Sequence, residues 1–135
     1  AFYFACSITI TDVTGTDDFA IGFRKKEAFN AIDSYDEMAA FNIISGDIKI
    51  ETILNNGSTT TTDTTDNWAD AASKTLKVLV SAAGVVTYQI DGSAPTTTAA
   101  FTFDNGEVVT PFVHLLHDSD VAEATIITAW DVGFQ

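Results

Sequence analysis

The stretch Thr75–Gly92, TLKVLVSAAGVVTYQIDG, decides the fold class. Its first part, Thr75–Ser81, alternates apolar and polar side chains with the period of a half-buried strand. Ala83-Gly84 then turns the chain, Val85–Ile90 returns as a second strand, and Asp91-Gly92 marks another turn. We therefore predict a β-hairpin whose buried faces meet. Its core residues are Leu76, Val78, Val80, Val86, Tyr88 and Ile90.

The same alternation recurs on both sides of this hairpin. Further strands are predicted at Ser7–Thr11, Phe19–Arg24, Met38–Ile44, Asp47–Ile53, Ala99–Phe103, Val108–Leu116 and Ala124–Phe134. Pro111 suits an edge strand or a bulge. Ala28–Glu37 is either a short helix or an ordered loop. Ser58–Asp66, STTTTDTTD, has no apolar side chain, and we predict an exposed loop that Trp68 fixes to the core.

Short strands separated by turns predict an all-β protein, an antiparallel jelly-roll β-sandwich with a single domain over residues 1–135. The start at Ala1, in place of an initiator Met, suggests a processed chain or an ordered part of a longer one. Cys6 is the only cysteine, which excludes an intramolecular disulfide and a thiolate metal cluster. We expect Cys6 to be a small core residue.

Charge limits the classes of partner. Six Lys and Arg against 19 Asp and Glu give a net charge of −13. Such a chain repels phosphate backbones and anionic lipids, so we expect neither a nucleic-acid nor a membrane partner. The longest mostly apolar run, Val78–Tyr88, is interrupted by Ser81 and Gly84 and falls well short of the roughly 20 residues of a membrane-spanning helix.

The hairpin at Thr75–Gly92 resembles that of concanavalin A-like jelly rolls, the group of lectins, laminin-G domains and glucanases. Ile126–Gln135, IITAWDVGFQ, looks like the last strand of that group, which pairs near the first, and Phe19–Phe23, FAIGF, looks like its early inner strand. The resemblance implies a sugar-binding protein, a polysaccharide-cleaving enzyme or a surface module of a viral particle. The acidic, Thr- and Ala-rich, cysteine-poor composition is similar to that of tailed-phage virion surface proteins.

The glucanases of this group carry three acids on one strand. The nearest match is Asp47–Glu51, DIKIE, in which Lys49 replaces the central Asp. The ends of such a stretch lie about 13 Å apart on a flat strand, whereas retaining cleavage needs two carboxyl groups about 5–5.5 Å apart. We interpret Asp47, Lys49 and Glu51 as the exposed face of a strand whose Ile48 and Ile50 point inward. We expect no catalytic residues and no enzyme.

Several other residue types could bind a ligand. Tyr35 and Trp68 lie near predicted loops and are the candidates to stack on sugar rings, whereas Trp130 is expected in the core. His114 and His117 lie near Asp118 and Asp120, and we interpret the histidines as structural or exposed rather than as metal ligands. Loop acids offer oxygen ligands for Ca²⁺ but lack an EF-hand spacing, so no metal site is predicted and calcium is an alternative. These acids are Asp17, Asp18, Asp33, Asp36, Asp63 and Asp66.

Together these features favour a non-enzymatic virion structural protein, a capsid decoration or head-surface module at the virion surface. Its partner would be the viral capsid or further copies of itself in a homo-oligomer. We expect Ala1–Phe4 or Ala28–Tyr35 to supply the apolar contacts. The alternative is an extracellular, lectin-like module that binds glycans with or without calcium. A glycan-cleaving enzyme is the third hypothesis.

Overall fold

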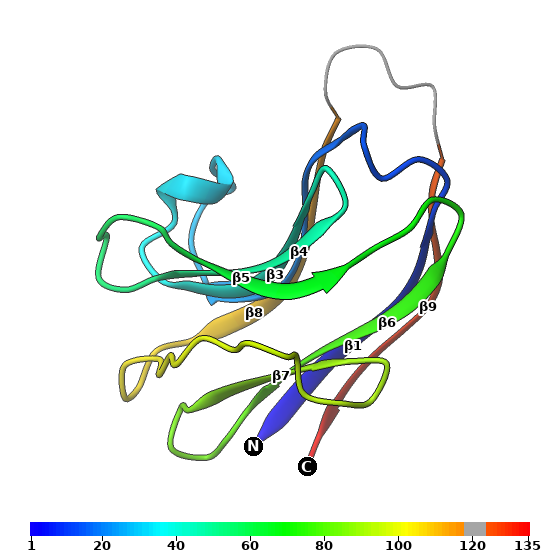
Figure 1. Ribbon diagram of the computed structural model, residues 1–135. Helices are drawn as coiled ribbons and strands as arrows, with labels where there is room; N and C mark the ends of the chain where they lie inside the picture. The colour runs from blue at the N-terminus through cyan, green and yellow to red at the C-terminus, as the bar shows by residue number, and fades with distance from the viewer. Residues whose placement is uncertain (118–123) are drawn as a thin grey trace.

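The computed structural model describes residues 1–117 and 124–135, which form two antiparallel sheets packed face to face (Figure 1). The four-stranded sheet has the order β7 (Val86–Ile90), β6 (Ser73–Val80), β1 (Phe2–Ile10) and β9 (Thr125–Phe134). The five-stranded sheet has the order β5 (Thr60–Asn67), β4 (Asp47–Ile53), β3 (Met38–Ile44), β2 (Thr16–Lys25) and β8 (Val109–His117). The expectation of an all-β sandwich is confirmed. No described helix has the length and hydropathy needed to cross a membrane.

The predicted hairpin at Thr75–Gly92 is formed by β6 and β7. Its strands pair in antiparallel register, with Leu76 opposite Ile90 and Val80 opposite Val86, and all six predicted core residues are buried. Gly84 has a φ of 80°, and a Cβ there would lie 2.7 Å from the Phe103 carbonyl oxygen. Only glycine fits this turn without strain, so the turn fixes the register of the hairpin.

The main core lies between the two sheets and collects the inward side chains of both. Cys6 is buried in it, as expected. Trp68 is also buried there, and its Nε1 donates to the Ala72 carbonyl at 3.0 Å. The backbone N–H of Trp68 donates to Gly46 at 2.8 Å. These two bonds confirm that Trp68 fixes the end of the Thr-rich segment to the core.

The prediction of a loop at the Thr-rich segment is wrong, because most of Ser58–Asp66 belongs to strand β5. Threonine is β-branched and suits a strand. An edge strand pairs on one side only, and β5 pairs with β4. Thr64 is fully buried, and its hydroxyl donates to the Ile48 carbonyl at 2.5 Å. A threonine hydroxyl can therefore be buried by bonding to the neighbouring strand, as Thr64 is. Composition alone does not predict this.

Of two other predicted strands, one is absent from the structure and one is confirmed. Ala99–Phe103 is not a strand, and its ladder pairing is limited to an isolated bridge from Thr102 to Val85. Phe101 and Phe103 still pack into the core, with ring centroids 5.0 Å apart. The predicted strand with Pro111 is confirmed as β8, and it is an edge strand as expected.

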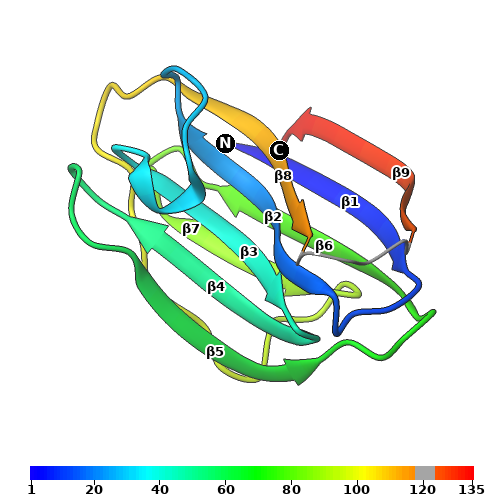
Figure 2. The same cartoon turned by 90° about the horizontal axis from the view of Figure 1, so that it is seen from above.

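A second, smaller core covers part of the outer face of the five-stranded sheet. The segment Ala28–Glu37 contains a 3₁₀ helix, η1 (Ile32–Ser34), which lies over that sheet in both views (Figures 1 and 2). Ile32 and Tyr35 from this segment pack on outward side chains of the sheet. Those side chains are Ala20, Met38, Ala40, Ile53 and Phe112. The outer face therefore has an apolar, covered end, and the polar residues beside it form the candidate site.

Candidate functional site

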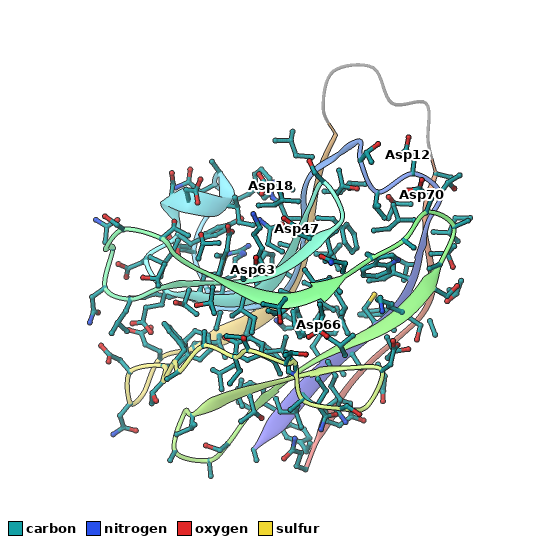
Figure 3. The ribbon with its side chains drawn as sticks, in the orientation of Figure 1. Asp12, Asp18, Asp47, Asp63, Asp66 and Asp70 are labelled. Carbon is teal, nitrogen blue, oxygen red and sulfur yellow. The ribbon has the colours of Figure 1, made fainter. Side chains whose placement is uncertain are left out.

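Three polar side chains meet on the outer face of the five-stranded sheet, and we call them the acid–amide cluster: Asp18 of β2, Asn42 of β3 and Glu51 of β4. Figure 3 labels Asp18, on the side of the sheet that carries η1. Each follows or precedes an inward apolar residue, so strand alternation turns it outward. Asn42 is fully buried, Glu51 is 5% exposed and Asp18 is half-buried.

Asn42 bridges the two carboxylates of the cluster. Its Nδ2 donates to Asp18 Oδ1 at 2.6 Å and to Glu51 Oε2 at 2.9 Å. Because both contacts share one nitrogen, the two carboxylate oxygens lie at most about 5.5 Å apart, within the range in which one carboxylate affects the ionisation of another.

Burial raises the pKa of Glu51 above its ordinary value, and the negative charges of Asp18 and Asp33 add to this. Hydrogen bonds from Asn42 and from Thr61, whose Oγ1 donates to Glu51 Oε1 at 3.2 Å, oppose the shift without cancelling it. Glu51 therefore holds its proton to a higher pH than a free glutamate. A glutamate with a raised pKa is suited to act as an acid.

The burial of Glu51 corrects an expectation. Glu51 does share the face opposite Ile48 and Ile50, but it is not exposed as Asp47 is. The cover comes from outside β4, because Thr61 of the edge strand β5 contacts Glu51 and Thr59 donates to Asp33 of η1 at 2.9 Å. That last bond ties the start of β5 to η1 beside the cluster.

One acceptor in the cluster is unused. Asn42 Oδ1 is buried and has no hydrogen-bond partner among the described residues. An orphaned buried acceptor costs on the order of 1–3 kcal/mol, so it marks a place where a donor from a ligand or a water would be stabilised.

Four polar side chains and one alanine lie in a row across the outer face of the sheet, and Asn42 of the cluster is one of them. Strand register places His114 opposite Ala20, Ala20 opposite Asn42, Asn42 opposite Lys49, and Lys49 opposite Asp63. Neighbouring strands are about 4.8 Å apart, so His114 lies about 10 Å from Asn42 on the same face. The His114 ring stacks on Phe29, with centroids 5.8 Å apart.

The two aromatic residues predicted to stack on sugars are both buried. Tyr35 is 1% exposed, with the Arg24 guanidinium 4.6 Å above its ring and the Phe112 ring 5.9 Å away. Trp68 is 3% exposed in the main core. Neither ring offers a face to a sugar in this structure, so sugar binding by them stays a prediction without structural support.

Trp130 was predicted to lie in the core, and this prediction is wrong, because the side chain is 72% exposed. It does lie on the inner face of its sheet, opposite Cys6. The physical reason for its exposure is that β9 is an edge strand, exposed along most of its length, which the partner sheet does not cover.

The acids considered as calcium ligands are dispersed among separate partners. Asp36 accepts from Lys25 Nζ at 2.6 Å, Asp63 accepts from the Thr65 N–H, and Asp66 accepts from Thr96. Within residues 1–117 and 124–135, no group of three or more His, Cys, Asp or Glu is placed to hold a metal ion. Four residues named in the sequence argument fall wholly or by their side chains outside the described part: Asp17, His117, Asp118 and Asp120.

Comparison with known proteins finds a similar fold but identifies no family. No protein-family model matches the chain, and no curated protein matches it. Among solved structures, the chain is similar to the alginate lyase PA1167 from Pseudomonas aeruginosa, with a TM-score of 0.64 and 13% sequence identity. The match covers 99% of this chain and 64% of the lyase chain, so this chain spans less than two thirds of its neighbour.

This neighbour corrects the expectation that the chain is not an enzyme. That expectation rested on a jelly roll that lacks the glucanase triplet, yet an enzyme of another activity has the same fold. Absence of one family's motif therefore says nothing about other sites on the sheet. Asp18 and Asn42 were missed as a site because their neighbourhood is created by strand pairing. The available signal was Asn42, a polar residue inside the apolar strand MAAFNII.

Proposed function

We propose that this chain is a carbohydrate-active domain of concanavalin A-like jelly-roll type that binds a neutral polysaccharide over the acid–amide cluster and hydrolyses it. The observation that carries the proposal is the pair of carboxylates, Asp18 and Glu51, held at most about 5.5 Å apart by Asn42. Retaining glycoside hydrolysis uses two carboxyl groups about 5–5.5 Å apart.

The two acids take different roles because their surroundings differ. Glu51, whose pKa is raised by burial, donates its proton to the glycosidic oxygen as the bond to the anomeric carbon breaks. Asp18 attacks that carbon and forms a glycosyl ester. Glu51 then takes a proton from water, whose oxygen displaces Asp18 and restores both carboxyl groups. Asn42 is a positioning residue that holds both carboxylates through one amide nitrogen.

The substrate is expected to be uncharged. A net charge of −13 and two acids in the cluster repel a polyanion. Alginate, the substrate named for the structural neighbour, is a polyanion, so this chain and the neighbour would share a fold and differ in substrate. The chemistry of two carboxyl groups requires no cofactor, and calcium stays an alternative that a chelator arm of the assay tests.

The test is release of reducing ends from neutral β-glucans, xylan and mannan, with alginate and EDTA arms. We expect cleavage of a neutral polymer with retained anomeric configuration by NMR. Glu51→Gln and Asp18→Asn should each lower the rate about 10²–10⁴-fold. Asp47→Asn is the matched control, because Asp47 is an exposed acid on the same strand as Glu51. Cleavage of no polymer, or full activity in Glu51→Gln, would overturn the proposal, and binding without cleavage would support the lectin alternative.

A second candidate function is the one that the sequence favoured. In it, the chain is a structural module on the surface of a viral particle. The observation in its favour is the exposed apolar side chains at one edge of the sandwich, among them Trp130 and Phe134. A module displayed on a particle needs such a contact surface. Co-sedimentation of the chain with the particle from which it is purified tests this candidate, and a chain found only in free form would refute it.

A further inference from the structure

The sandwich is open along one side. β8 ends the five-stranded sheet and β9 ends the four-stranded sheet, and a hollow of about 470 Å³ is lined by residues from both strands. Strand register shows that the inner face of β9 continues the core row of β1, because Val132 lies opposite Phe4 and Trp130 lies opposite Cys6. Figure 2 shows β8 and β9 at this side of the molecule. Inward side chains, which are buried in the middle of the sandwich, are therefore left uncovered at this edge.

These inward side chains are exposed. We call them the β8/β9 edge patch, and its members with their exposed fractions are Val113 (41%), Leu115 (42%), Ile127 (45%), Trp130 (72%), Val132 (45%) and Phe134 (90%). An aromatic side chain offers about 150–250 Å², so Trp130 and Phe134 alone present on the order of 300 Å². With the four aliphatic residues the patch reaches roughly 600 Å², the upper end of the range for the largest apolar patch on a monomer, and such patches are often functional.

The patch is uncharged in a strongly anionic chain. β8 contains no Asp, Glu, Lys or Arg, and Asp131 is the one such residue of β9. The Asp131 carboxylate accepts a hydrogen bond from the Tyr3 hydroxyl at 2.6 Å. Edge strands that must stay free are usually protected by lysine, proline or inward charges, and β9 has none of these. Both the backbone edge and the side chains of β9 are therefore suited to pair with another strand.

We propose that a second copy of this chain covers the patch, with β9 pairing antiparallel to β9 of its partner about a two-fold axis. Two identical strands pair antiparallel with complete self-complementarity. The patch residues that meet are uncharged, and Asp131, the one charged residue of β9, accepts a hydrogen bond from Tyr3 of its own copy, so most of the charge of −13 lies away from the contact. The roughly 600 Å² of apolar area per copy, together with the paired backbone, approaches the roughly 800 Å² per partner of a stable interface.

The test is sedimentation and native mass spectrometry of the intact chain across a dilution series. We expect a species of about 29 kDa, twice the 14.4 kDa of one chain, that dissociates on dilution. Trp130→Asp and Val132→Lys should each weaken the dimer about 100-fold, as substitutions at the centre of an interface do. Phe29→Asp is the matched control, because Phe29 is 78% exposed but lies outside the patch.

Hydrogen exchange of the wild-type chain gives a readout that does not depend on the folding of a variant. Amides of β9 should exchange slowly in the dimer and quickly after dilution, while those of the opposite edge strand, β5, should not change. A monomer at all concentrations would overturn the proposal. So would a dimer that Phe29→Asp breaks and Trp130→Asp leaves intact, or binding of a different protein or of a vesicle by a chain that never dimerises.

Discussion

Glu51→Gln should raise the stability of the folded chain at neutral pH although it removes the proposed acid. Burial raises the pKa of Glu51, which means that the folded state disfavours the ionised carboxylate. Glutamine has the same shape and no charge. Its amide oxygen can accept from Asn42 Nδ2, and its amide nitrogen can donate to Thr61 Oγ1, so both hydrogen bonds of Glu51 have a replacement.

The sign of the pH dependence follows from the direction of the shift. Below the ordinary glutamate pKa of 4.5, Glu51 is protonated in both states, so its favourable contribution to folding is present in full and the variant gains nothing. As pH rises through the raised pKa of the folded state, that contribution is lost and the penalty for the buried charge appears. The advantage of Glu51→Gln should therefore grow from about pH 4 to pH 7.

Substitutions that relieve a strained functional site commonly add about 0.5–2 kcal/mol. For a chain of 135 residues, 1 kcal/mol corresponds to a rise in Tm of roughly 3–5 °C. The assay is urea unfolding at pH 4 and pH 7 for wild type, Glu51→Gln and the control Asp47→Asn, whose parent residue is exposed. A loss of stability at pH 7 equal to or larger than that at pH 4 would refute the argument, because Glu51 would then be a structural anion.

The remaining predictions concern packing and turns. Gly84→Ala should lower stability by about 1–3 kcal/mol, because φ is 80° and the Cβ would meet the Phe103 carbonyl; an unchanged urea midpoint would count against this. Phe41→Ala, at a fully buried ring, should cost about 3–5 kcal/mol by the same measurement, and a cost below 1 kcal/mol would contradict the burial. Thr64→Val should cost about 1–2 kcal/mol by removing the bond to the Ile48 carbonyl, and a more stable variant would exclude that role.

The strands were predictable where the pattern is local. In Thr75–Gly92 each strand alternates cleanly, and the Gly84 turn decides which residues face each other. The same holds for Met38–Ile44, which is β3 at the predicted bounds. β5 was missed because its threonines lack apolar character, although an edge strand pairs on one side only and β-branching favours it.

The candidate site was not predictable in this way, because it consists of residues from three strands. Asp18, Asn42 and Glu51 come together only through the β2–β3–β4 register. The surroundings of Glu51 come from other strands, with Thr61 of β5 and Asn42 of β3 both bonded to its carboxyl group. The strand pattern gave the correct face for Glu51. The pattern carries no information on what covers that face, and the cover is what raises the pKa of its carboxyl group.

Trp130 and Glu51 both show that strand alternation predicts the direction of a side chain but not its exposure. Alternation places Trp130 on the inner face of its sheet, and the register confirms it, yet the ring is 72% exposed because it lies at an edge that the opposite sheet does not cover. Glu51 faces outward and is nevertheless buried. A strand's period fixes the direction of a side chain, whereas exposure depends on what packs against that direction. Trp130 belongs to the β8/β9 edge patch and Glu51 to the acid–amide cluster, so each of these two residues lies on a proposed functional surface. Such disagreements are where a function is to be sought, because a fold gains nothing from a buried outward acid or an uncovered inward tryptophan unless a ligand or a partner uses it.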